Sequence, residues 1–209
     1  MVIWLIGTLF VGCGLLMSPP PIELGKTNVL LIVNCTLRAD RLQSYGYAVP
    51  SSPHLKNWMA KGVTFDAHIA QAPWTRPSLG SIVSGHHPRH LGLDNPEDDH
   101  SFGLVLQEEV TTIAELFQSQ GYSTIGSVGN PNAKSQFGFR QGFDVYHEPD
   151  KTFREGLRLS STKELASHIL QAQEGKDVVF AQLMTVDTHQ RVQYEEVDLA
   201  AIRQHHPKD

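Results

Sequence analysis

Two continuous apolar runs, near opposite ends of the chain, constrain the fold more than any other feature of the sequence. They are Asn28-Val-Leu-Leu-Ile-Val33 and Asp177-Val-Val-Phe-Ala-Gln-Leu-Met184. Runs that stay apolar without alternating favour strands buried on both faces of a parallel sheet. Such a sheet needs helices on both faces, and the sequence between the runs supplies helix signals.

Helix and strand signals alternate between the two runs. Thr112 and Glu115 stand three residues apart, as in a capping box, and Gly121 follows as a stop signal. This alternation predicts an α/β fold with a mainly parallel sheet. We expect helices over residues 53–61, 77–84, 111–120 and 161–173, further strands over 63–65 and 122–128, and loops over 94–103 and 129–150.

Composition narrows the class of protein. The chain has 209 residues, of which 40% are hydrophobic, and a formal net charge of -5. These values fit one globular domain with a sizeable core. No basic run is present, which argues against a nucleic-acid partner. Two cysteines, Cys13 and Cys35, are too few for a disulfide framework.

The N-terminal segment has the pattern expected of a targeting signal. Residues 2–17 contain no charged side chain. This run is shorter than the roughly 20 apolar residues that a membrane span needs, and its length suits the apolar region of a secretory signal. Alternatives are a buried helix, or a lipid anchor at Cys13, since Gly12-Cys13 resembles a lipobox. We therefore expect residues 1–27 to be a signal peptide or a membrane or lipid anchor with a Pro-rich tether, and the protein to be secreted or periplasmic.

Ligands of open α/β sheets bind beyond the carboxyl ends of the strands. The segments at these ends are Asn34-Cys35-Thr36, after the first run, and Thr185 to His189, after the last. His189 could donate a proton to a leaving group, or it could be a surface histidine. A lone cysteine such as Cys35 is more often a small buried side chain than a metal ligand. His86, His87 and His90 lack a neighbouring carboxylate or cysteine and indicate a solvated loop.

Thr75 lies at or just before a predicted helix N-terminus, in Ala72-Pro-Trp-Thr-Arg-Pro-Ser78. Free N–H groups and the positive end of the helix dipole favour anions there. A hydroxyl at that point could attack a bound phosphoryl or sulfuryl group, with a divalent metal to activate it. The alternative is that Thr75 merely caps the helix.

Several stretches, taken in order, resemble the sulfatase family of the alkaline-phosphatase-like superfamily. The similarity covers about residues 28–190. The matching stretches are Asn28 to Leu42, Ser52-Pro-His-Leu55, Gly62-Val-Thr-Phe65, Ala72 to Ser78, Ser81-Ile-Val-Ser-Gly85 with Pro88, Thr112 to Asn132, Phe137-Gly-Phe-Arg-Gln-Gly-Phe-Asp144 and Val186-Asp-Thr-His189.

This resemblance implies an alkaline-phosphatase-like α/β fold over residues 28–209, truncated at the C-terminus. It also implies hydrolysis of sulfate or phosphate esters of small molecules or glycans, with a bound divalent cation, usually calcium. The residues assigned by it are Thr75 as nucleophile and His189 as its catalytic partner, Arg76, Asn130, Asn132 and Asp187 as substrate contacts, and Cys35, Thr36 and Thr75 as metal ligands.

The sequence departs from the family pattern at its chemical positions. Typical sulfatases carry Cys or Ser where Thr75 stands, and Leu79 replaces their Arg. Threonine cannot give formylglycine by that route and is the nucleophile of phosphodiesterase-like relatives, which favours phosphoester chemistry. Cys35 replaces an Asp metal ligand, and a thiolate suits zinc better than calcium. Residues 129–132 replace a Lys and a His, and no Asp-His-Gly segment follows His189. The alternative is a non-catalytic remnant that binds anions.

Overall fold

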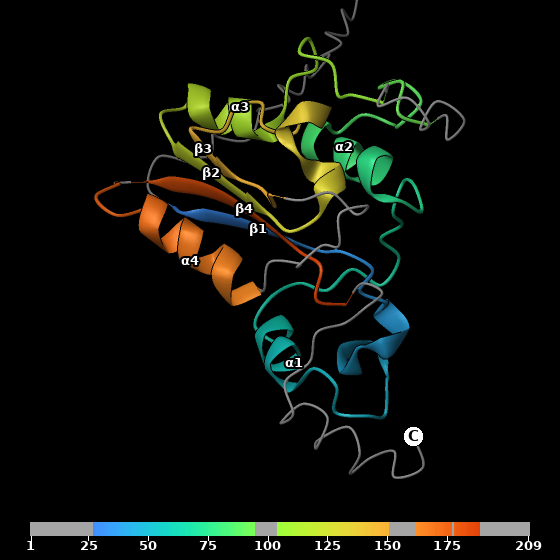
Figure 1. Ribbon diagram of the computed structural model, residues 1–209. Helices are drawn as coiled ribbons and strands as arrows, with labels where there is room; N and C mark the ends of the chain where they lie inside the picture. The colour runs from blue at the N-terminus through green and yellow to red at the C-terminus, as the bar shows by residue number, and fades with distance from the viewer. Residues whose placement is uncertain (1–26, 95–103, 151–161, 177, 189–209) are drawn as a thin grey trace, which may run out of the picture.

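A computed structural model describes residues 27–94, 104–150, 162–176 and 178–188 of the chain (Figure 1). Its centre is a four-stranded sheet in the order β1-β4-β2-β3, in which every pairing is parallel. The predicted α/β class with a parallel sheet is thereby confirmed. The strands are β1 (Val29–Asn34), β2 (Ser123–Val128), β3 (Val145–His147) and β4 (Val179–Thr185).

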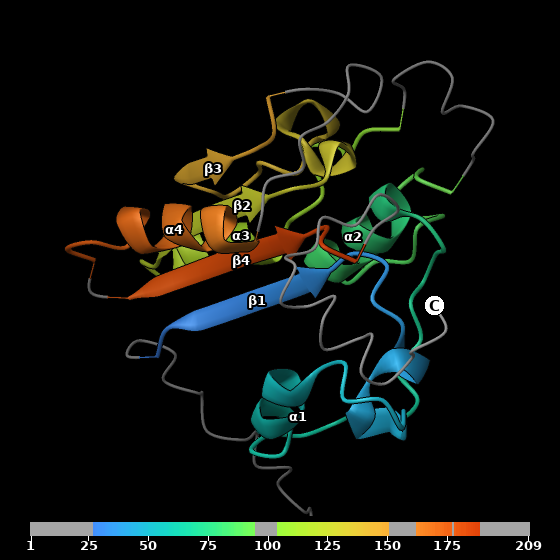
Figure 2. The same ribbon diagram turned by 60° about the horizontal axis from the view of Figure 1, so that its bottom comes forward.

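Helices cover both faces of the sheet (Figures 1 and 2). α4 packs on one face, against β2 and β4, while α2 and α3 lie on the other. α1 stands apart, beyond the β1 edge. The helices are α1 (Pro53–Met59), α2 (Thr75–Ser84), α3 (Ile113–Ser119) and α4 (Thr162–Ala172).

The two apolar runs differ in burial. β4 is buried along its whole length, as its sequence predicts, because it has a strand on each side and helices on both faces. β1 instead alternates, with Leu30 54% and Ile32 38% exposed. Burial of β1 on both faces was therefore a wrong prediction for the described residues. β1 is an end strand in the sheet order, and α4, which packs on the face that carries Leu30, lies over β2 and β4.

Local signals in the sequence fix several helix ends. The capping box of α3 forms as predicted, with the Thr112 backbone N–H donating to Glu115 Oε2 over 2.7 Å. α2 ends as predicted at Gly85, whose φ of 72° lies in the left-handed region. α2 begins at Thr75, two residues earlier than predicted, which makes Pro77 part of its first turn.

Two segments differ from their predictions. Residues 63–65 form no strand, and Val63 is 83% exposed with no strand partner among the described residues. Residues 129–150 are not all loop, since β3 lies within them and pairs with β2. They also contain two short 3-10 helices, η4 (Pro131–Ala133) and η5 (Ser135–Phe137). A strand of three residues is too short to show a period in sequence.

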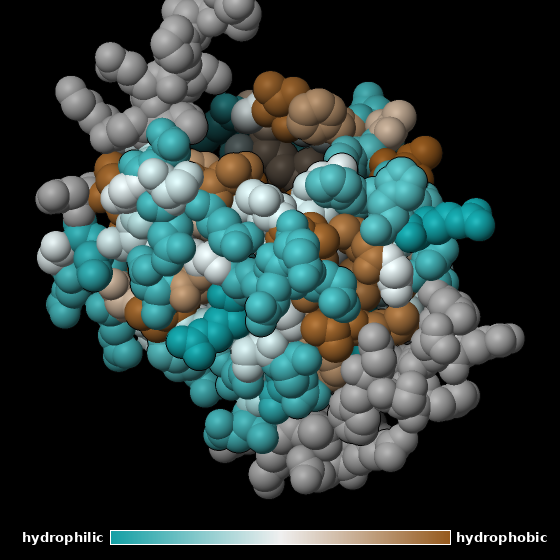
Figure 3. All heavy atoms as spheres, turned by 90° about the horizontal axis from the view of Figure 1, so that it is seen from above, coloured by the Kyte–Doolittle hydropathy of each residue, from teal (hydrophilic) through white to brown (hydrophobic). Residues whose placement is uncertain are grey.

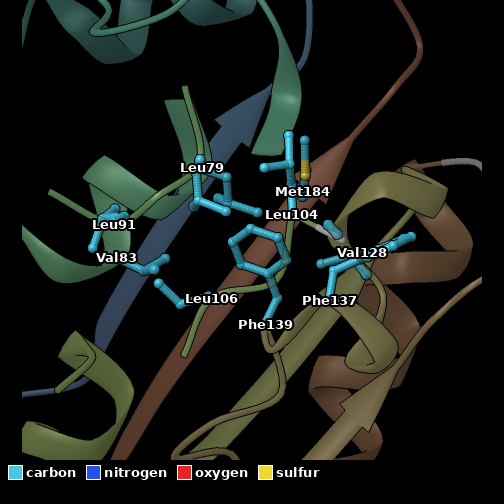
Figure 4. Close-up of a cluster of buried hydrophobic side chains, with 11 residues drawn as sticks. Leu79, Val83, Leu91, Leu104, Leu106, Val128, Phe137, Phe139 and Met184 are labelled. Atoms are coloured by element: carbon cyan, nitrogen blue, oxygen red, sulfur yellow. The ribbon is translucent and has the colours of Figure 1, made fainter. Parts of the chain in front are cut away.

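The core that matters most for the site lies between α2 and the sheet (Figure 4). Leu79 of α2 meets Met184 of β4 and Phe137 of η5 there, each at most 4% exposed. This packing holds the first turn of α2 against the carboxyl ends of the strands. Seen from above, the surface is largely hydrophilic, with smaller hydrophobic patches between (Figure 3).

No described helix is both long and apolar enough to cross a membrane. Residues 2–17, predicted as signal or anchor, lie outside the described residues, so that prediction stays a prediction.

Candidate functional site

Three residues far apart in sequence meet at the carboxyl end of the sheet. Cys35 directly follows β1, Asn130 is the second residue after β2, and Thr75 is the first residue of α2. Asn130 Nδ2 lies 3.1 Å from Thr75 Oγ1 and 3.4 Å from Cys35 Sγ. The structure therefore brings together one member of each predicted group: nucleophile, metal ligand and substrate contact.

The Asn130 side chain is the fixed centre of this group. It is 0% exposed, and its Oδ1 accepts a hydrogen bond of 2.9 Å from the backbone N–H of Asn132. This bond identifies the oxygen end of the amide, so the NH₂ end faces Thr75 and Cys35. Asn132 is half-buried and takes part through its backbone.

Thr75 does not cap α2. The N-cap residue is Trp74, and the side-chain cap hydrogen bond is missing. The half-buried Thr75 hydroxyl instead accepts from Asn130. It keeps its own proton to donate, and it lies at the positive end of a helix of 10 residues. That placement suits a hydroxyl that meets an anionic group.

Arg76 is held in the interior. Its side chain is 6% exposed, and its guanidinium carbon lies 3.6 Å from the centroid of the Phe137 ring. This cation–π contact fastens η5 to the first turn of α2. Leu79, at the position of a family Arg, is 1% exposed and belongs to the hydrophobic core.

The loop after β1 is tied to the loop after β4. The Thr36 hydroxyl lies 2.7 Å from the Cys35 carbonyl and 2.8 Å from that of Thr188, and the Thr188 hydroxyl donates to Cys35 O over 2.6 Å. Thr36 has a φ of 62°, in a region that costs a β-branched residue on the order of 1–3 kcal/mol. The Thr36 hydroxyl thus donates to backbone carbonyl groups in both loops.

Asp187 follows β4 and is exposed. Partial loss of hydration raises the pKa of its carboxyl group, and a hydrogen bond with the backbone of Thr162 opposes this shift. His189 lies outside the described residues, so its predicted role stays a prediction.

A hollow of about 430 Å³ opens elsewhere, lined by residues that include Glu108, Ser135 and Arg140. None of the site residues predicted from the sequence lines it. It therefore offers no direct support for the predicted chemistry.

One polar cluster was missed by the sequence analysis. The rings of His147 in β3 and His168 in α4 stack with centroids 4.1 Å apart, and His168 Nδ1 lies 3.4 Å from the Ser127 hydroxyl. Burial lowers the pKa of His147, and the neighbouring His168 lowers it further. The three residues are scattered in sequence, so no local signal could have identified them.

Comparisons with known proteins agree with this architecture. A model of the family named Sulfatase matches residues 27–206. Arylsulfatase A of Bos taurus is 32% identical over 119 residues, which span 56% of this chain and 22% of that protein. The chain thus spans less than a quarter of that curated relative's length.

Two solved structures illustrate the shared fold. The phosphonate monoester hydrolase of Agrobacterium radiobacter has a TM-score of 0.61 at 18% identity, over 78% of this chain and 41% of that one. BT4656, solved with D-glucosamine-2-N,6-O-disulfate, has a TM-score of 0.65 at 16% identity, over 79% of this chain and 35% of that one.

Proposed function

The chain belongs to the sulfatase family, and from that premise we propose that it hydrolyses sulfuric or phosphoric esters with Thr75 as the nucleophile. One observation carries the proposal: the Thr75 hydroxyl stands at the N-terminus of α2 and accepts from Asn130, a neighbour fully buried behind it. A hydroxyl so placed meets the negative charge of a sulfate or phosphate group at the positive end of the helix.

The reaction would proceed in two balanced steps. Thr75 Oγ gives up its proton to solvent and forms a bond to phosphorus or sulfur, while the bond to the alcohol oxygen breaks and that oxygen takes a proton, which His189 would supply. Water then attacks the threonine ester and its oxygen leaves with the phosphate or sulfate, while one of its protons restores the Thr75 hydroxyl and the other returns to His189. The Asn130 N–H donates to Thr75 Oγ1 over 3.1 Å and so stabilises negative charge that develops there.

Two observations bear on the substrate. Threonine cannot use formylglycine chemistry, and one structural neighbour is a phosphonate monoester hydrolase, which together favour phosphorus esters. Another neighbour binds a sulfated glucosamine, which supports a glycan ester. We propose an anionic ester of a sugar or small molecule, met in a secreted or periplasmic location.

Proteins of this family are generally dependent on a divalent metal, yet the donors described here fit such an ion poorly. The expected ligands Cys35, Thr36 and Thr75 bring a thiol and two hydroxyls, and calcium prefers carboxylate and carbonyl oxygens. The Thr36 hydroxyl is engaged with two backbone carbonyls. Asn130 presents N–H groups, not acceptors, to the other two residues. The residues expected as ligands, as far as the structure describes them, therefore do not fit a calcium ion.

The contact between Asn130 and Thr75 also favours a second candidate, anion binding without turnover. An amide donor lowers the nucleophilicity of the oxygen that accepts from it, and threonine is a weak nucleophile unless activated. In that case the N-terminus of α2 would retain a sulfate or phosphate ester unchanged.

Turnover of nitrophenyl phosphate and nitrophenyl sulfate by the full chain tests the proposal. We expect activity that falls by at least about 10³-fold in Thr75→Ala, because loss of a nucleophile removes the covalent route. Thr75→Ser is the matched control and should retain most of the activity. Binding of the ester without turnover in the folded wild type would instead establish the anion-binding function.

A further inference from the structure

One amide group fills the space between two side chains that were both expected to bind a cation. Asn130 Nδ2 carries two N–H groups, and two acceptors lie within their reach: Thr75 Oγ1 at 3.1 Å and Cys35 Sγ at 3.4 Å. A cation shared by this thiol and hydroxyl would have to stand where the N–H groups point. The N–H hydrogens already occupy that space and carry positive partial charge, so a cation placed there would be repelled.

The Asn130 side chain is not free to turn away. Its Oδ1 is fixed by the Asn132 N–H, its own carbonyl accepts from the Ala133 N–H over 2.9 Å, and the residue is 0% exposed. Before Asn130, the Gly129 N–H donates to Met184 O over 2.8 Å. The peptide on each side of Asn130 is therefore anchored, and a flipped amide would lose the bond from Asn132.

We infer that the Asn130 amide takes the place of a shared cation between Cys35 and Thr75, and that it orients Thr75 through a hydrogen bond. Asn130 is then a positioning residue, and Cys35 is a hydrogen-bond acceptor in place of a metal ligand. The inference rests on the proposed function only in treating Thr75 as the hydroxyl that meets the ester.

Cobalt(II) binding tests this directly, because a thiolate bound to Co²⁺ gives a charge-transfer absorption band. All measurements use the full chain carrying Cys13→Ser, which removes the other cysteine. We expect no thiolate–Co²⁺ band in this chain. A stoichiometric band that Cys35→Ser abolishes would overturn the inference.

The variant Asn130→Asp tests the same inference from the opposite direction, by creating a site that should bind a cation. It replaces the N–H donor by a carboxylate, which together with Cys35 and Thr75 forms a set of acceptors. We expect this variant to gain the thiolate band and to bind Co²⁺ at least about tenfold more tightly, since a carboxylate is a ligand and an N–H group is not. Adding Cys35→Ser should remove the band.

Asn132→Asp is the matched control, because it adds the same charge two residues away without altering the amide between Cys35 and Thr75, and it should give no band. A folded Asn130→Asp chain without a band would contradict the geometry. If Asn130→Asp does not fold, the chain with native Asn130 still decides, since a band there refutes the inference and its absence supports it. Failure of ester turnover would leave this metal result unchanged, so the two proposals can fail separately.

Discussion

At the scale of single residues, α2 combines a polar first residue, Thr75, with a side chain packed in the core, Leu79. Leu79 stands where typical sulfatases carry an Arg, yet it is 1% exposed and lies in the core beside Met184. Thr75, four residues earlier, keeps its place at the start of α2 and accepts from Asn130. The substitution at Leu79 is thus part of the hydrophobic packing that holds Thr75.

Restoring the family residue at Leu79 should therefore cost stability. We expect Leu79→Arg to lower the free energy of unfolding by about 3 kcal/mol or more, because it buries an uncompensated charge. Ile82→Arg is the matched control, since Ile82 lies in the same helix and is 43% exposed, and it should cost less than about 1 kcal/mol. Urea unfolding followed by circular dichroism measures both. Equal costs would mean that Leu79 does not occupy the core.

At the scale of elements, sequence patterns predicted what depends on local chemistry. The capping box at Thr112 fixed the start of α3, and the buried run fixed β4. β3 was not predicted, because a strand of three residues shows no pattern in sequence and is recognised only through its pairing with β2. The contact of Asn130 with Cys35 and Thr75 escaped it too, because the three residues meet only when β1, β2 and α2 are packed.

His147 of β3, which stacks on His168 of α4, should make the stability of the folded chain depend on pH. The pKa of His147 is lowered in the folded chain from the ordinary histidine value of about 6.5. As the pH falls below that ordinary value, the unfolded chain therefore binds a proton at His147 more readily than the folded chain does. Stability contributed by neutral His147 is therefore present above about pH 6.5 and is lost as the pH falls through the folded pKa. We expect Tm to drop between pH 7 and pH 5, and to drop less in His147→Gln. An unchanged drop in that variant would show that other groups cause it.

At the scale of the whole molecule, the described sheet has a fully buried inner strand, β4, and a partly open end strand, β1. β1 presents Leu30 and Ile32 on the face of the sheet where α4 packs, but α4 lies over β2 and β4 and leaves them exposed, although the sequence of β1 is that of a buried strand. The match to this chain spans 22% of its curated relative and 35% to 50% of its structural neighbours, so those proteins are longer than this chain.

Because one face of β1 is exposed, we expect side chains shortened to alanine to lower the free energy of unfolding less there than in the core. Ile125→Ala, at a residue 1% exposed, should cost about 2–5 kcal/mol through a buried cavity. Ile32→Ala, at a residue 38% exposed, should cost about 1 kcal/mol or less. Chemical denaturation of the full chain compares the two. A cost at Ile32 equal to that at Ile125 would show that this face of β1 is covered in solution.

Trapping a covalent ester on Thr75 tests most directly whether Thr75 is the reacting hydroxyl. The full chain is mixed with nitrophenyl phosphate or nitrophenyl sulfate, quenched in acid and digested, and the peptide that contains Thr75 is analysed by mass spectrometry. We predict a phosphorylated or sulfated Thr75 in the wild type and no adduct in Thr75→Ala. Turnover that leaves Thr75 unmodified, or that survives in Thr75→Ala, would contradict the account.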